Sequence, residues 1–220
     1  MDTKIKSKKR YSLGEEIFNS ISHGIGAVFG IAATAVMLVW AVMFGDTIGV
    51  VSAAIYGATL IIMYTMSTLY HAFTSERVKR IFQIFDHCSI FLLIAGTYTP
   101  ICLTGLGGQV GWTVFGIVWG CAVFGIVISS VKVKRWSHVV SVILYLIMGW
   151  MVVFTLRPVI ELLGGRGFVL LLTGGALYTI GIIFYLLKKV AYMHSVWHLF
   201  VLGGSVLHFL CVLLYIIPVR

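Results

Sequence analysis

Long apolar stretches separated by short polar segments dominate the chain, and six of them contain no Lys, Arg, Asp or Glu. These uncharged windows are 17–45, 47–75, 87–131, 136–156, 167–187 and 190–219. A helix needs about 20 such residues to cross the hydrocarbon layer, because every backbone polar group there must be satisfied within the segment. The third window is too long for one crossing, and its glycine-rich stretch 104–111 has the composition of a turn. The pattern therefore predicts seven membrane-spanning helices.

We expect an all-α membrane protein, a seven-transmembrane-helix bundle in one domain. The expected spans are roughly 21–44, 48–73, 81–103, 110–131, 136–156, 167–187 and 193–217. A basic segment, 1–16, precedes the transmembrane domain, 17–220.

Basic residues alternate between the two ends of this predicted bundle. Thirteen of the 16 lie on one side: Lys4, Lys6, Lys8, Lys9, Arg10, Arg77, Lys79, Arg80, Lys132, Lys134, Arg135, Lys188 and Lys189. Only Arg157, Arg166 and Arg220 lie on the other. Short cytoplasmic loops are enriched in Lys and Arg, so we expect the N-terminus in the cytoplasm and the C-terminus outside.

Composition agrees with a membrane protein and narrows the partners. Apolar residues make up 60% of the 220 residues and charged residues only 10%, which leaves too little polar surface for a soluble globule. The net charge of +9 comes from clusters between apolar runs, so we expect no nucleic acid partner. Cysteines occur only inside apolar stretches and without CxxC spacing, which predicts neither disulfides nor a thiolate metal site. They are Cys88, Cys102, Cys121 and Cys211.

Ionisable residues of three predicted helices lie at one depth. His71 precedes Arg77 by six residues, and Asp86 follows Arg80 by six. The pair His194 and His198 follows Lys189 by five and nine residues and shares one helix face through its i, i+4 spacing. Ser67 has the same i, i+4 relation to His71. These side chains can therefore point inward together, near the cytoplasmic surface.

This cluster predicts a zinc site with His71, His194 and His198 as ligands. Three neutral imidazoles leave a fourth tetrahedral position for water, which is the form of a catalytic zinc site. Such a site can hydrolyse an amide or ester, with Asp86 orienting or deprotonating the water and Ser67 hydrogen-bonding a ligand or the water. Alternatively, the histidines are amphipathic interface residues that bind nothing. The cost of ionisable groups inside the membrane favours the zinc site.

The other histidines are expected to have different roles. His23 and His138 begin the first and fifth spans, where an interfacial role is favoured over ligation, and a position lining the site is the alternative for either residue. His87 adjoins Asp86 but points about 100° away from it around the helix. His208 lies about 15 Å deeper than His198 and is expected to pack within the bundle.

At these residues the sequence resembles the hemolysin III branch of the progestin and adipoQ receptor family, seven-helix membrane proteins related to alkaline ceramidases. The resemblance covers nearly the whole chain and rests on four motifs in order. They are Glu16, Asn19 and His23 before the first helix; Ser67-Thr-Leu-Tyr-His71; Asp86 with Tyr98-Thr-Pro100; and His194-Ser-Val-Trp-His198. The resemblance implies zinc held by the three histidines, with Ser67 and Asp86 beside it, and hydrolysis of lipid amides such as ceramides. Unlike the receptors, the sequence has no sizeable N-terminal domain, so hormone binding is not expected.

Three functional classes follow, and the expected partner is a membrane lipid as substrate or ligand. We favour a zinc-dependent lipid amide or ester hydrolase of the bacterial plasma membrane, acting in membrane-lipid homeostasis. The alternatives are a zinc-containing sensor of lipid state without catalysis and a pore-forming cytolysin. A pore is disfavoured because its lining needs polar groups at every depth. The sequence predicts no particular oligomeric state.

Overall fold

Every regular element in residues 11–130 and 136–218, the part of the chain that the computed structural model describes, is helical. The helices are α1 (Leu13–Phe44), α2 (Thr47–Ala72), α3 (Glu76–Pro100), α4 (Gly108–Ser130), α5 (Trp136–Gly149), α6 (Leu156–Leu186) and α7 (Met193–Cys211). Three short segments extend or join them: π-helical η1 (Ile101–Leu106) and η3 (Val212–Ile216), and 3-10 helical η2 (Met151–Thr155). The predicted all-α class is confirmed for these residues.

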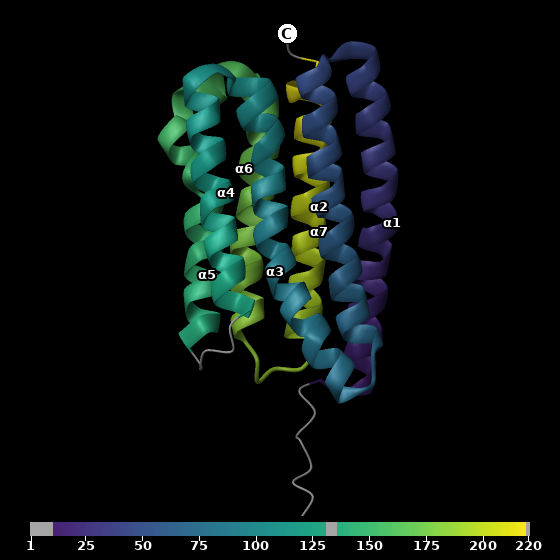
Figure 1. Cartoon of the computed structure of the whole chain (residues 1–220). Coiled ribbons are helices and arrows are strands. Elements are labelled where there is room, and N and C mark those ends of the chain that lie inside the picture. The colour runs from purple at the N-terminus through teal and green to yellow at the C-terminus, as the bar shows by residue number, and fades with distance from the viewer. Residues whose placement is uncertain (1–10, 131–135, 219–220) are drawn as a thin grey trace, which may run out of the picture.

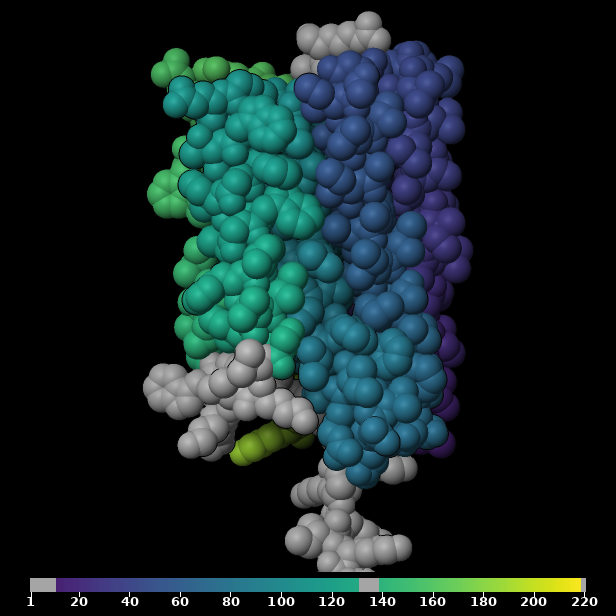
Figure 2. Space-filling view, in the orientation of Figure 1, coloured from purple at the N-terminus to yellow at the C-terminus, as the bar shows by residue number. Residues whose placement is uncertain are grey.

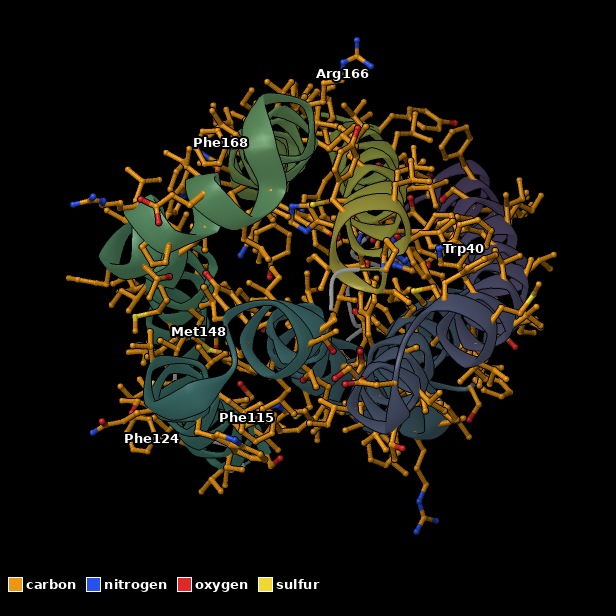
Figure 3. The ribbon with its side chains drawn as sticks, turned by 90° about the horizontal axis from the view of Figure 1, so that it is seen from above. Trp40, Phe115, Phe124, Met148, Arg166 and Phe168 are labelled. Carbon is orange, nitrogen blue, oxygen red and sulfur yellow. The ribbon has the colours of Figure 1, made fainter. Side chains whose placement is uncertain are left out.

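The helices lie side by side along one axis, and α7 runs behind α2 and α3 (Figure 1). We call the end where α1 begins the N-terminal end of the bundle; η3 finishes at the opposite end (Figure 1). In the view along the axis, Met148 points inward and Phe124 and Arg166 point outward (Figure 3), in agreement with complete burial of Met148 and 58% exposure of Phe124. The space-filling view shows side chains of α4 and α2 packed on neighbouring parts of one face (Figure 2).

Six helical segments among the described residues are long and apolar enough to cross a membrane. One of them, Val139–Leu186, is 48 residues long and includes most of α5, all of η2 and α6. The sequence predicts two separate spans there, so a count of seven is not confirmed by length and hydropathy. In addition, α1 begins at Leu13, eight residues before the first expected span, and its first turn carries Glu15 and Glu16.

Helix ends follow local sequence signals. Ser12 and Glu15 form a reciprocal capping box at the start of α1, and the Asp46 side chain caps α2 by accepting a hydrogen bond from the Gly49 amide at 2.7 Å. Where η1 meets α4, Gly107 and the first residue of α4, Gly108, adopt φ of +59° and +50°, which L side chains rarely adopt. The turn predicted from the glycine-rich stretch 104–111 is therefore confirmed.

Close helix contacts at small residues hold α1, α2 and α3 together, with the start of α1, the end of α2 and the start of α3 at the N-terminal end of the bundle. A Cβ added at Gly26 of α1 would lie 2.3 Å from the Tyr64 ring of α2, and one at Gly96 of α3 would lie 1.9 Å from Thr59 Oγ1 of α2. Only glycine permits these backbone approaches, as is common between membrane helices. The three helix ends and the start of α7 surround the candidate site.

Candidate metal centre

Three histidine side chains from two helices converge at the N-terminal end of the bundle. His71 lies in the last turn of α2, and His194 and His198 lie in the first two turns of α7. The Nε2 atom of His194 is 3.3 Å from that of His71 and 3.2 Å from that of His198. One ligand atom from each ring lies within 4.8 Å of the others. The predicted trio is therefore brought together by the fold.

Two separations between these nitrogens fit a tetrahedral zinc ion. Zinc–nitrogen bonds of about 2.0–2.1 Å in tetrahedral geometry place ligand nitrogens about 3.3 Å apart, which matches the two separations of 3.2 and 3.3 Å. A metal site also requires that each of these nitrogens carries a lone pair rather than a proton. Whether Nε2 carries the lone pair depends on the hydrogen-bond partner of Nδ1, the other nitrogen of the same ring.

His71 has its tautomer set by Glu16 of α1. The His71 Nδ1 atom is 2.7 Å from Glu16 Oε2, and an ionised carboxylate only accepts hydrogen bonds. Nδ1 therefore carries the proton, and Nε2 of the neutral ring presents a lone pair to the other two histidines.

His198 has its tautomer set in the same way by Ser22. The Ser22 hydroxyl donates to the Asn19 carbonyl oxygen at 3.0 Å and lies 3.2 Å from His198 Nδ1. Because its one proton is used, the hydroxyl accepts from His198 Nδ1. Two bare Nε2 lone pairs then face His194, whose single N–H can satisfy only one of them. A bound cation satisfies all three nitrogens at once.

The surroundings of the trio are buried and aromatic. His71 is 3% exposed and His198 is completely buried. The Tyr11 ring stacks on His194 with centroids 4.9 Å apart, and His23 stacks on His198 at 3.5 Å. The prediction of an interfacial His23 is wrong: the side chain is 0% exposed, because α1 packs this face against α2 and α7.

The two predicted catalytic residues lie close to the trio in different ways. Asp86, 4% exposed, lines a small pocket together with His194, Tyr11 and Tyr70. Ser67 is completely buried one turn before His71, and its Oγ has no hydrogen-bond partner among the described residues. The side-chain nitrogens of Asn19 and His23 are likewise buried without such a partner. Several unpaired polar atoms around one cluster fit a site that binds a polar ligand.

Of the remaining histidines, His208 and His87 have packing contacts. His208 Nε2 donates to the Leu171 carbonyl oxygen of α6 at 3.0 Å, so the predicted packing role is confirmed. His87 Nδ1 contacts the Gln83 carbonyl oxygen at 2.5 Å. The side chain of His138 lies outside the described residues.

Comparison with known proteins places the chain in a family. Residues 11–209 match the family described as Haemolysin-III related. The chain belongs to this family. Its relatives include Hemolysin-3 of Bacillus cereus, 45% identical over 93% of both chains, and the Hemolysin-3 homolog of Bacillus subtilis (strain 168), 43% identical over 95% of this chain and 98% of the relative. A distant relative is human monocyte to macrophage differentiation factor, 25% identical over 76% of this chain and 71% of the relative.

Membership in the haemolysin-III family, together with the apolar helices, makes this chain a multi-pass membrane protein. Its matched region contains the three histidines, Asp86 and Ser67.

An apolar cavity adjoins the histidine cluster. It has a volume of about 170 Å³ and lies mainly between α3, α5, α6 and α7. Most of its lining is aliphatic or aromatic, and Ile90, Tyr185 and Trp197 also line the small pocket that contains Asp86 and His194. The polar cluster thus lies at one end of an apolar chamber.

Glu16 and Ser22, which contact the outer nitrogens of two ligand rings, are not among the site residues predicted from the sequence. Glu16 falls in the basic N-terminal segment 1–16 and in the motif with Asn19 and His23. A usable signal existed, since Glu16, Asn19 and His23 follow an i, i+3, i+7 spacing that puts them on one helix face. That face contacts α2 and α7.

Proposed function

We propose that this protein is a zinc-dependent hydrolase of a lipid amide or ester in the bacterial plasma membrane. The observation that carries the proposal is the triangle of Nε2 atoms, two of whose edges measure 3.3 and 3.2 Å, with the outer nitrogens of two rings held by Glu16 and Ser22. Zinc at this position would polarise the lipid carbonyl and activate a water molecule.

The chain's own residues supply the rest of the chemistry. Asp86, in the pocket beside His194, accepts the proton of the attacking water and returns it to the leaving amine or alcohol. Ser67, whose Oγ has no other partner among the described residues, donates a hydrogen bond to the polar linkage of the lipid. His71, His194 and His198 would hold the metal.

The apolar cavity supports a lipid as the substrate. An acyl chain in it would lie among α3, α5, α6 and α7 with its polar linkage toward Asp86 and His194. Three cavity-lining residues, Trp150, Val153 and Leu172, are 38%, 52% and 45% exposed, so the cavity reaches the outer surface of the bundle. A lipid chain can enter there without passing through water.

The test of this proposal is release of fatty acid by purified protein in lipid nanodiscs, assayed against ceramides and phospholipids. We expect release from at least one lipid, its loss after zinc is chelated, and its return when zinc is restored. Zinc-loaded protein that releases no fatty acid from any lipid would contradict the hydrolase.

We further propose seven crossings, with the N-terminus cytoplasmic and the C-terminus outside. Supporting this, a helical segment of 48 residues would be about 72 Å long as one straight helix, more than twice the roughly 30 Å hydrocarbon layer. It also contains Gly164 with non-helical φ and ψ of 60° and −176°, and the exposed Arg157 and Arg166 flank this point.

Thiol labelling of spheroplasts tests this topology. In a background without the four native cysteines, we expect a membrane-impermeant maleimide to label Gly165→Cys in intact spheroplasts. The matched control, Thr74→Cys in the exposed turn between α2 and α3, should be labelled only after permeabilisation. Labelling of Thr74→Cys but not of Gly165→Cys in intact spheroplasts would mean that the topology is inverted. If neither variant is labelled in intact spheroplasts, residue 165 lies inside.

The burial of the trio also favours a second candidate, a sensor of lipid state whose zinc is not catalytic. Tyr11 stacks over the half-buried His194, as expected for a closed site. The names of the bacterial relatives raise a third candidate, a lytic pore, but the mostly apolar lining of the cavity is unlike that of an aqueous channel.

A further inference from the structure

Glu16 joins three helices at the candidate metal centre. One carboxylate oxygen contacts His71 Nδ1 of α2 at 2.7 Å, and the other contacts Lys79 Nζ of α3 at 2.5 Å. Glu16 itself lies in the first turn of α1. Both oxygens are thus engaged, by partners on two different helices.

This arrangement fixes the orientation of the carboxylate and, through it, of the His71 ring. A carboxylate held at one oxygen can rotate about its terminal bond, but two partners in different directions remove that freedom. Lys79 is held as well: its ammonium lies 5.1 Å from the centre of the Tyr70 ring. The Tyr70 ring in turn lies 4.6 Å from that of His71.

The contribution of these contacts to folding stability is expected to be small. Glu16 and Lys79 side chains are 18% and 24% exposed, and ion pairs that water reaches contribute little. The His71 side chain, by contrast, is 0% exposed, so the orientation of its ring depends on its neighbours. The contact is better suited to orienting His71 than to holding the helices together.

We propose that Glu16, held by Lys79, is a positioning residue that orients His71 and thereby sets the affinity of the site for zinc. The inference rests on the zinc site of the proposed function but not on catalysis. Carboxylates that orient ligating histidines change metal affinity by about 10- to 100-fold when they are removed.

The neighbouring Glu15 provides a matched control. It lies in the same helical turn, and its carboxylate accepts hydrogen bonds from the Tyr192 amide at 2.9 Å and the Ser12 amide at 2.8 Å. Glu15 therefore links α1 to the start of α7, and neither of these hydrogen bonds involves a ligand ring. Glu15→Gln removes the same charge as Glu16→Gln and keeps a residue suited to the capping box.

The experiment measures zinc dissociation constants of full-length protein in nanodiscs by competition with a chelator. We expect Glu16→Ala to weaken binding by about 10- to 100-fold, Glu16→Gln and Lys79→Met to weaken it less, and Glu15→Gln to leave it within about twofold. Equal weakening by Glu15→Gln and Glu16→Gln, or unchanged binding by Glu16→Ala, would overturn the inference.

A double-mutant cycle separates positioning from a general structural effect. If Glu16 acts through His71, Glu16→Ala should cause no further loss of zinc affinity in a His71→Ala background. An additive loss would contradict positioning through His71. The wild-type measurement distinguishes the two proposals: absence of zinc binding by the wild type would refute the metal centre itself, whereas zinc binding unaffected by Glu16 would refute only this inference.

Discussion

His198→Ala should purify with far less zinc than the wild type, which we expect to carry about one zinc ion per chain. His198 supplies the Nε2 atom 3.2 Å from that of His194, and its removal leaves two protein nitrogens. Two imidazoles bind zinc much more weakly than three. Elemental analysis of protein in nanodiscs measures the stoichiometry.

His208→Gln is the control for this experiment, because His208 lies on the same helix and its Nε2 contacts the Leu171 carbonyl oxygen rather than the cluster. The amide of glutamine can still donate to that oxygen, so zinc content should stay near one per chain. Removing zinc from the wild type with a chelator and adding it back tests the same site without a mutation. Zinc content that is unchanged in His198→Ala would disprove the proposed ligand set.

Asp86→Asn should keep its zinc and lose hydrolytic activity by about 10²- to 10⁴-fold, the usual contribution of a general acid–base residue. Asn has nearly the same shape as Asp but cannot accept a proton from water. Asp86 is 4% exposed and lines the pocket with His194, whereas the proposed ligands are the histidines. Fatty acid release and zinc content, measured on one preparation, separate catalysis from metal binding.

Asp46→Asn is the matched control for Asp86→Asn. Asp46 caps α2 at the opposite end of the bundle, and Asn is an equally good N-cap residue, so both activity and zinc content should be unchanged. Full hydrolytic activity of Asp86→Asn would remove Asp86 from the mechanism. If Asp86→Asn binds zinc and functions normally in cells while the wild type hydrolyses no lipid, the sensor replaces the hydrolase.

Local sequence patterns predicted the helical class and the position of one turn. Hydropathy reports on helices because each spanning segment must satisfy its own backbone, and Gly107 and Gly108 mark the turn because they adopt positive φ. Length and hydropathy alone do not divide Val139–Leu186, and the two spans predicted there, 136–156 and 167–187, are separated by Arg157, Glu161 and Arg166. Apolar residues continue through η2 between α5 and α6, with no charged residue before Arg157.

The approximate location of the candidate site also followed from sequence. The spacing of His194 and His198 places them on one face of α7 through the helical period alone. Distance from the basic clusters gave His71 and Asp86 a similar depth. The sequence predicts depth because depth follows from a residue's position along a spanning helix. This sufficed to select the trio that the fold brings together.

The sequence by itself determined the apolar helices, the turn at Gly107 and Gly108, and the depth of the ionisable residues, because each depends on neighbours along the chain. The tertiary structure decided which face of each helix meets which partner. It buried His23 against His198 and joined Glu16 to His71 and Lys79. Rotation of a helix about its axis depends on packing against other helices, at contacts such as Gly26 with Tyr64, and not on position along the chain.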